Sequence, residues 1–208
     1  MTRWMRSLQA VENWLLLMLA LPIALPLMVI GAALIKLDSP GPVLYVSKRV
    51  GQGGRLIPVL KFRTMHVDAQ ARLQRLLMED AVLRGEWERF HKLRDDPRVT
   101  RLGRWLRRSS LDELPQLLNV LAGQMYLIGP RPVFPHEFVR YYHGQARRHY
   151  LSVKPGITGL WQVCGRSDLD FPTRVLLDSW YVAHWSVWLD LWILLRTIKV
   201  VLRREGAY

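Results

Sequence analysis

Residues 13–35 read NWLLLMLALPIALPLMVIGAALI, and no side chain in this stretch carries a charge. At a rise of 1.5 Å per residue, about 20 such residues could cross the hydrocarbon core of a bilayer. A cleaved signal peptide is the alternative, but the apolar run is long for one, and no small-x-small cleavage site precedes its polar flank. The stretch therefore predicts a membrane anchor, which we expect to occupy residues 1–37.

Two prolines and the flanking charges bear on how this anchor meets the membrane. Pro22 and Pro26 each remove a backbone donor and kink a helix. A helix that enters the bilayer, breaks at these prolines and returns on the same side would leave both basic flanks in the cytoplasm. An ordinary spanning helix that tolerates both prolines is the alternative. The flanking basic residues are Arg3 and Arg6 before the segment, and Lys36, Lys48, Arg49 and Arg55 after it.

The charge of the whole chain calls for an acidic partner. Its 208 residues suffice for one compact domain, expected at residues 38–208, in addition to the anchor. Lys and Arg outnumber Asp and Glu by 30 to 17, which gives a formal net charge of +13. Nucleic acid, anionic lipid headgroups and phosphorylated substrates all fit that charge. Cys164 is the only cysteine, so an intrachain disulfide is excluded.

A second segment near the C-terminus has a membrane-active pattern. If residues 185–203 are helical, aromatic and basic side chains share one stripe. Such a stripe suits the headgroup layer, where indoles anchor and long basic side chains reach toward water. A core helix with inward-facing Trp residues is the alternative, because the other faces are also apolar. The stripe consists of Trp185, Trp188, Trp192, Arg196, Lys199 and Arg203.

Extended and helical segments follow the anchor. The runs Val43–Val50 and Leu56–Met65 predict a β-hairpin around a glycine-rich turn. In the second strand, Lys61 and Arg63 would point to the same face, either toward a ligand or toward solvent. The segment Asp68–Lys92 predicts a helix, because leucines recur in it at helical spacing.

Two adjacent carboxylates follow a dense basic patch. Asp112 and Glu113 lie where Ser109–Leu121 predicts the start of a helix, close to the positive end of its dipole, where phosphate binds readily. The alternative is a capping box, since Ser110 and Glu113 have its spacing. The basic patch before them consists of Arg101, Arg104, Arg107 and Arg108.

Two further segments favour a functional interpretation of these carboxylates. In Gly129-Pro130-Arg131-Pro132, prolines on both sides stiffen the backbone around one guanidinium. Later, Gly159, Gly165 and Arg166 indicate another place where a backbone could approach a ligand beside a cation. Taken together, the basic and glycine-containing segments predict a site for a diphosphate.

Four ordered motifs closely resemble those of the bacterial sugar transferases, also called monotopic phosphoglycosyl transferases. They are KFRTM at 61–65, SLDELPQ at 110–116, LIGPRP at 127–132 and KPGITGLWQV at 154–163. Within that family, the insertion 68–100, the run 165–167 and the ending 203–208 look most like undecaprenyl-phosphate galactose or glucose phosphotransferases. The resemblance implies an α+β fold, mainly helical with a small β-hairpin, a re-entrant membrane helix and C-terminal interfacial helices. The family often has Ser-Pro at the helix break, whereas this chain has Leu25-Pro26 and lacks the serine that would help to fix the bend.

The resemblance also implies a two-step transfer. Asp112 matches the family nucleophile, which takes hexose-1-phosphate from a UDP-sugar, expels UMP and passes the phosphosugar to undecaprenyl phosphate. Glu113 would act as a base or help Asp112 to hold Mg²⁺, an ion that prefers oxygen ligands. Arg107 and Arg131 match phosphate-contacting positions. The other cations expected in the same pocket are Lys61, Arg63 and Arg166.

These matches imply where the chain works and with what. We expect a bacterial inner-membrane enzyme with its site on the cytoplasmic face, acting in the first membrane step of exopolysaccharide, O-antigen or capsule assembly. The expected partners are a UDP-sugar, undecaprenyl phosphate and membrane lipid, without nucleic acid; a homodimer is left open. A membrane-tethered basic module that binds nucleic acid or anionic lipid is the competing hypothesis, under which Asp112 would be dispensable. A multi-span transferase would need more long apolar segments than the sequence provides.

Overall fold

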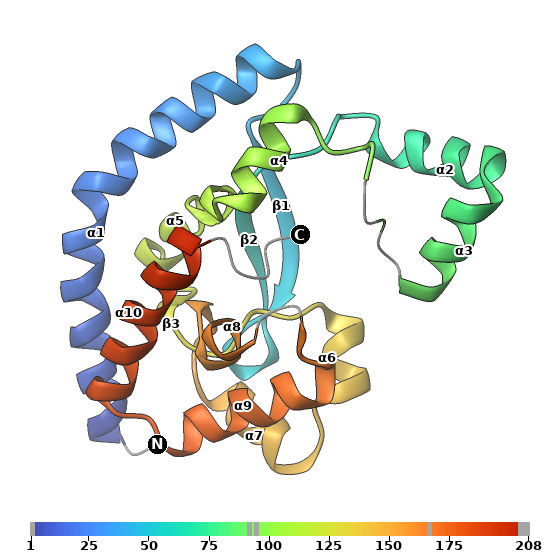
Figure 1. Cartoon of the computed structure of the whole chain (residues 1–208). Helices are drawn as coiled ribbons and strands as arrows, with labels where there is room; N and C mark the ends of the chain where they lie inside the picture. The colour runs from blue at the N-terminus through green and yellow to red at the C-terminus, as the bar shows by residue number, and fades with distance from the viewer. Residues whose placement is uncertain (1–2, 91–92, 94–95, 166–167, 204–208) are drawn as a thin grey trace.

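The computed structural model of the chain describes residues 3–90, 93, 96–165 and 168–203. One long helix, α1 (Arg3–Asp38), runs along one side of a mainly helical domain that also contains two small sheets (Figure 1). The predicted combination of many helices with little strand is confirmed.

Helix α1 continues through Pro22 and Pro26, and its axis changes direction along its length (Figure 1). Each proline lacks the N–H that would bond one turn back, and its ring crowds the preceding turn, which bends a helix. The predicted break is therefore a bend within one continuous helix. Within the described residues, α1 is the one helix long and apolar enough to cross a membrane. Its Leu19, Ile23 and Val29 are at least 70% exposed, unlike the residues of a core helix.

The opposite face of α1 packs against the domain. Leu17 is fully buried there among apolar side chains. Nearer the N-terminus, the Gln9 side-chain amide donates to the Tyr181 hydroxyl at 3.2 Å, and the Asn13 side-chain oxygen accepts from the Leu127 N–H at 2.8 Å. Because hydrogen bonds are directional, these two contacts determine which face of α1 meets the domain.

Strands β1 (Leu44–Val50) and β2 (Leu56–Phe62) form the predicted antiparallel hairpin, joined by the 3-10 turn η1 (Gln52–Gly54). Strand β2 ends earlier than predicted. The reason is that the chain turns toward another partner, since Met65 forms an isolated bridge with Val99. The register of the hairpin directs the end of β2 toward the segment that contains the two adjacent carboxylates.

The helix predicted over residues 68–92 is divided. Helices α2 (Ala69–Glu79) and α3 (Ala81–Phe90) meet at Asp80, and the end of the predicted helix lies outside the described residues. The Asp80 carboxylate accepts a hydrogen bond from the Val82 N–H at 2.8 Å, so this residue caps α3 instead of continuing α2. The pair projects away from the rest of the domain (Figure 1).

The basic patch and the carboxylates occupy separate elements. Helix α4 (Arg101–Arg108) is followed by the 3-10 turn η2 (Leu111–Glu113) and by α5 (Gln116–Leu121). The expected capping box is absent, because Ser110 adopts a left-handed conformation with φ 57° and its side chain makes no capping hydrogen bond. The carboxylates therefore precede the regular helix by one tight turn.

The C-terminal half surrounds a short parallel sheet. Strand β3 (Tyr126–Ile128) pairs with β4 (Gly156–Thr158), which lies within the KPGITGLWQV motif. The main apolar core of this half includes Ile128, Tyr181 and Ile193. The helices around the sheet are α6 (Pro135–Tyr141), α7 (Gly144–Ser152), α8 (Leu160–Cys164), α9 (Phe171–Ala183) and α10 (Val187–Arg203).

Helix α10 carries most of the predicted aromatic and basic stripe on its surface. Trp188 is 81% exposed and Trp192 is 41% exposed, with Arg196 stacked over the Trp192 ring. Trp185 is an exception and the prediction for it was wrong. It precedes the helix, is buried, and donates its indole N–H to Asp190 at 2.8 Å.

The packing of α4 on the segment that follows β2 predicts an effect of Gly103→Ala. A Cβ at Gly103 would overlap the backbone carbonyl of Thr64, so the helix would have to move. We expect a loss of about 2 kcal/mol in the free energy of unfolding, measured by thermal unfolding in detergent. The matched control is Gly85→Ala in α3, which meets no atom within 4 Å and should be neutral or stabilising by up to about 1 kcal/mol. Equal stability of the two variants would contradict the close contact.

Candidate active site

Asp112 and Glu113 lie in η2 with 14% and 17% of their side chains exposed. The left-handed backbone of Ser110 turns the chain sharply after α4. As a result, both carboxylates face the end of β2, where Lys61 is located. Local backbone geometry thus places two acids in a shielded position beside a cation.

Glu113 joins three segments of the chain. Its Oε1 accepts a hydrogen bond from the Lys61 ammonium at 2.6 Å and from the Arg131 guanidinium at 2.9 Å. Burial alone would raise the pKa of Glu113, but Arg131 and Lys61 together hold it well below its usual range. Glu113 is therefore an anion that fixes the positions of two cations.

Asp112 is in a different electrostatic environment. Burial raises the pKa of Asp112 to about 6, and the neighbouring Glu113 charge adds to the rise, whereas Lys61 opposes it. The Lys61 ammonium lies 4.0 Å from Asp112 Oδ2, farther than from Glu113. Two adjacent carboxylates thus have pKa values displaced in opposite directions, a pattern typical of sites that perform chemistry.

Arg107 approaches Asp112 from α4. Its Nε donates to Thr64 Oγ1 at 2.9 Å, which holds the guanidinium between the helix and the segment after β2. Burial lowers the pKa of Arg107, while the Asp112 charge acts in the opposite direction. The sequence did not single out Thr64, and its position directly after the KFR run was the available signal.

Arg131 is held by the predicted rigid loop. Its flanking Pro130 is fully buried, and its guanidinium lies 5.9 Å from the ring centre of Trp161. Tyr150 supports the loop, since its hydroxyl accepts a hydrogen bond from the Val133 N–H at 3.2 Å. The side chain of Arg131 is thereby directed at Glu113.

A buried carboxyl group lies behind this loop. Asp178 on α9 accepts a hydrogen bond from the Tyr142 hydroxyl at 2.8 Å. Burial raises the pKa of Asp178 to about 8, although the Tyr142 hydroxyl and the backbone of Arg131 both act to lower it. No sequence pattern predicted this group, because Tyr142 and Asp178 are far apart along the chain and belong to no local motif.

Arg63, one of the predicted pocket cations, binds backbone away from the two carboxylates. Arg63 is 8% exposed and donates to the carbonyl oxygens of Pro40 at 2.6 Å and Ser39 at 2.8 Å. It binds the turn that follows α1, and the expectation that it shares a pocket face with Lys61 was wrong because β2 ends at Phe62. Arg166 lies outside the described residues.

The two carboxylates bear on the expected magnesium ion. Within the described residues, no group of three or more His, Cys, Asp or Glu side chains could enclose a metal. Mg²⁺ is commonly held by one or two carboxylates together with substrate phosphates, and Asp112 and Glu113 match that arrangement. These residues therefore fit an ion that arrives with a diphosphate.

A shielded carboxylate beside cations, on a domain with an exposed apolar helix, defines a membrane-associated protein with a site suited to phosphate groups. The chain belongs to the bacterial sugar transferase family, because the model of that family matches residues 4–204. The resemblance carried by the four motifs is thereby confirmed.

Several curated proteins are similar to this chain. Undecaprenyl-phosphate galactose phosphotransferase of Salmonella typhimurium is 54% identical over 168 residues, which cover 81% of this chain and 35% of that protein. UDP-galactose-lipid carrier transferase of Erwinia amylovora is 50% identical over 184 residues, covering 88% of this chain and 38% of that protein. The exopolysaccharide production protein ExoY of Sinorhizobium fredii is 42% identical over 194 residues, covering 93% of this chain and 85% of that protein. The chain thus spans little more than a third of the first two relatives and most of the third.

The pKa of Asp112 predicts a pH-dependent gain in stability for Asp112→Asn. The folded-state pKa of about 6 exceeds the ordinary 3.8, so the native chain loses stability as the pH rises through that interval and does not regain it above. Asn does not titrate, so the variant should be more stable by on the order of 2 kcal/mol at pH 8. This advantage should shrink as the pH falls toward 4. Thermal unfolding across this pH range measures it, with the exposed Asp168→Asn as control; a pH-independent difference would contradict the assignment.

Proposed function

We propose that this chain transfers hexose-1-phosphate from a UDP-sugar to undecaprenyl phosphate through a covalent aspartyl-phosphosugar, with release of UMP. The observation that carries the proposal is Asp112, a shielded carboxylate whose pKa is influenced by Lys61, Arg107 and Arg131 together. Relatives named for undecaprenyl-phosphate galactose and glucose phosphotransfer support the substrate classes. A relative named for exopolysaccharide production supports a role in glycan assembly.

In the first step, a carboxylate oxygen of Asp112 attacks the phosphorus that carries the sugar. The bond from that phosphorus to the oxygen of the nucleoside phosphate breaks, and UMP leaves with the electron pair. Lys61, Arg107 and Arg131 offset the charge of the diphosphate, which allows one anion to approach another. With a pKa of about 6, Asp112 is ionised at neutral pH but poorly solvated, which favours its action as a nucleophile.

In the second step, an oxygen of undecaprenyl phosphate attacks the same phosphorus. The bond to Asp112 breaks, the carboxylate is regenerated, and the sugar remains on a lipid diphosphate. A phosphate monoester is largely dianionic at neutral pH, so this nucleophile needs no proton removed. The cations that bind the diphosphate of the UDP-sugar in the first step thus also stabilise the lipid diphosphate that forms in the second step.

Glu113 has the properties of a fixed anion and would be a weak base. Arg131 and Lys61 hold its pKa well below the usual range despite its burial, and a general base works best with a pKa near the operating pH. We therefore assign to Glu113 the positioning of Lys61 and Arg131. Asp112 and Glu113 are also the residues that would hold Mg²⁺, which when bound neutralises charge on the diphosphate.

The substrates determine where the reaction has to occur. Undecaprenyl phosphate keeps its tail in lipid, whereas a nucleotide sugar is soluble in water, so the two meet at the membrane surface. The exposed apolar face of α1 fits a re-entrant helix with both ends on the cytoplasmic side of the inner membrane. Trp188 and Trp192 on α10 fit the headgroup layer. The competing hypothesis, a basic tethering module, gives no role to the opposed pKa shifts of Asp112 and Glu113, and the family match favours an enzyme.

The covalent step predicts a protein adduct. With radiolabelled UDP-hexose and Mg²⁺ but no lipid acceptor, we expect one burst of UMP equal to the amount of enzyme and label attached to Asp112. Addition of undecaprenyl phosphate should move the label to lipid. Asp112→Ala should lower turnover by at least about 10³-fold, because the nucleophile is lost.

The exposed Asp168→Ala is the matched control for loss of an aspartate and should keep its turnover. Comparison of UDP-glucose with UDP-galactose in the same assay identifies the sugar. Product formed at a normal rate, with no adduct recovered from Asp112, would refute the two-step mechanism.

The re-entrant arrangement predicts that both ends of α1 face the cytoplasm. In a chain with Cys164 replaced by Ser, single cysteines at the exposed positions Trp4 and Leu37 can be tested with a membrane-impermeant maleimide. Both should react in inverted inner-membrane vesicles and neither in right-side-out spheroplasts. Reaction of Trp4→Cys from the periplasmic side would instead indicate a spanning helix.

A further inference from the structure

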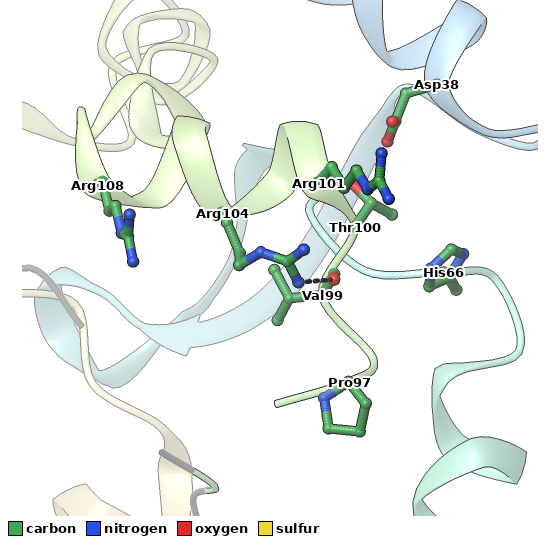
Figure 2. A pocket seen from close by; sticks show the side chains of 8 residues that line it. All are labelled: Asp38, His66, Pro97, Val99, Thr100, Arg101, Arg104 and Arg108. Carbon is green, nitrogen blue, oxygen red and sulfur yellow. Dashed lines mark hydrogen bonds between the residues drawn. The ribbon is translucent and has the colours of Figure 1, made fainter. Parts of the chain in front are cut away.

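A cleft of about 740 Å³ lies beside α4, near the C-terminal end of α1 and the segment after β2 (Figure 2). Arg101, Arg104 and Arg108 extend from α4 along it, and His66 lies across from them (Figure 2). In the described structure, its lining includes neither Asp112 nor the cations that surround that carboxylate. The cleft is therefore a second basic feature, distinct from the proposed active site.

The arginines of this cleft are available to a ligand. In the described part of the chain, Arg101 and Arg108 have no ion pair, and Arg104 donates one N–H to the Val99 carbonyl at 3.1 Å. The nearby Arg98 differs, because both oxygens of Asp96 bind it, at 2.8 and 2.6 Å. Such pairing is the usual way to satisfy an arginine inside a protein.

The balance of charge in the lining is positive. Asp38 is the one acidic residue among the described lining residues, and it could offset at most one of Arg101, Arg104 and Arg108. Among the lining residues that the structure describes, two positive charges are thus in excess. Two negative charges on one small group would match them.

The cleft begins where the apolar surface of α1 ends. Leu34 and Leu37 are 39% and 84% exposed on the last turns of that helix, and the next residue, Asp38, lines the cleft. Trp105, on the same helix as the arginines, is 48% exposed. The end of an apolar helix, an exposed indole and basic side chains together are typical of the depth of lipid headgroups.

Helix α4 also connects the cleft to Asp112. Arg108 lines the cleft, whereas its neighbour Arg107 donates to Thr64 and influences the pKa of Asp112. Consecutive Cα atoms are about 3.8 Å apart, and a helix with its side chains is about 10 Å wide. A phosphate held at Arg108 would thus be about one helix width from the reacting carboxylate.

We propose that this cleft is where the phosphate headgroup of the polyprenyl phosphate acceptor first docks, before it moves to Asp112 for the second step, an inference that rests on the proposed function. A phosphate monoester carries close to two negative charges at neutral pH, as the excess charge of the lining requires. The phosphodiester group of an ordinary phospholipid carries only one negative charge. Guanidinium groups present paired N–H donors that fit phosphate oxygens, and the exposed end of α1 offers the lipid tail an apolar surface.

The test removes two of the cleft arginines and compares this variant with one that lacks two arginines outside the cleft. The variant is Arg101→Gln with Arg108→Gln, and the control is Arg75→Gln with Arg148→Gln, two exposed arginines that do not line the cleft. Both variants are measured in phosphatidylcholine nanodiscs that contain undecaprenyl phosphate. We expect the KM for undecaprenyl phosphate to rise about tenfold in the cleft variant and to change less than about twofold in the control.

Two further measurements separate this inference from the proposed function. The UMP burst without acceptor should keep its amplitude in the cleft variant, because that half-reaction needs no lipid. A wild-type chain without a burst would refute the two-step function, while the comparison of KM values would still test the cleft. Phosphatidic acid, a phosphomonoester lipid that cannot replace the acceptor, should inhibit the wild type competitively and phosphatidylglycerol should not.

Three outcomes would overturn the proposal. They are an unchanged KM for undecaprenyl phosphate in the cleft variant, an equal rise in the control, and equal inhibition by phosphatidylglycerol, which would indicate a general surface for anionic lipid. The variant Arg101→Lys with Arg108→Lys retains the charge, and it should recover most of the affinity. Its failure to do so, with native thermal stability, would also contradict a role for these charges.

Discussion

The shared hydrogen bonds of Glu113 are the interaction on which the site depends. One carboxylate oxygen binds Lys61 from β2 and Arg131 from the Pro-Arg-Pro loop, residues 52 and 18 positions away along the chain. Ions removed from water are stable only when partners compensate for the lost hydration, so this group requires the hairpin, the 3-10 turn and the loop to come together. Asp112 gains its environment from this arrangement, since Lys61 and Arg131, two of the cations that act on its pKa, are already engaged by its neighbour.

The attachment of α1 relates this site to the membrane. Its outward face is apolar and exposed, while Gln9 and Asn13 on the inward face hydrogen-bond to the domain. Polar groups of this kind are unfavourable in hydrocarbon, so they define the side that must face protein. At the other end, Arg63 binds the carbonyl groups of the turn after α1. The helix is thus fixed to the domain at both ends, which gives Asp112 a defined position relative to the apolar face of α1.

Patterns within short segments predicted much of this structure. Two extended runs around a glycine-rich turn predicted the hairpin, and an uncharged run predicted α1. The motifs contain Lys61, Asp112 and Arg131, which the structure brings together around Glu113. The errors arose where an element is shorter than the local pattern predicted, or where a residue meets a distant partner. Arg63 follows the last strand residue, Trp185 precedes its helix, and the left-handed turn at Ser110 replaces a cap. The pairing of Tyr142 with Asp178 behind the loop depends on tertiary contacts that no spacing in the sequence encodes.

The projecting pair α2 and α3 has an evolutionary consequence. These helices pack chiefly against each other and extend away from the domain (Figure 1). Because the core and the reacting groups lie elsewhere, residues on this pair are subject to weak selection from packing. Lineages can therefore diversify its length and surface at small thermodynamic penalty, and it is the part of the molecule best suited to acquire new traits while the chemistry stays constant.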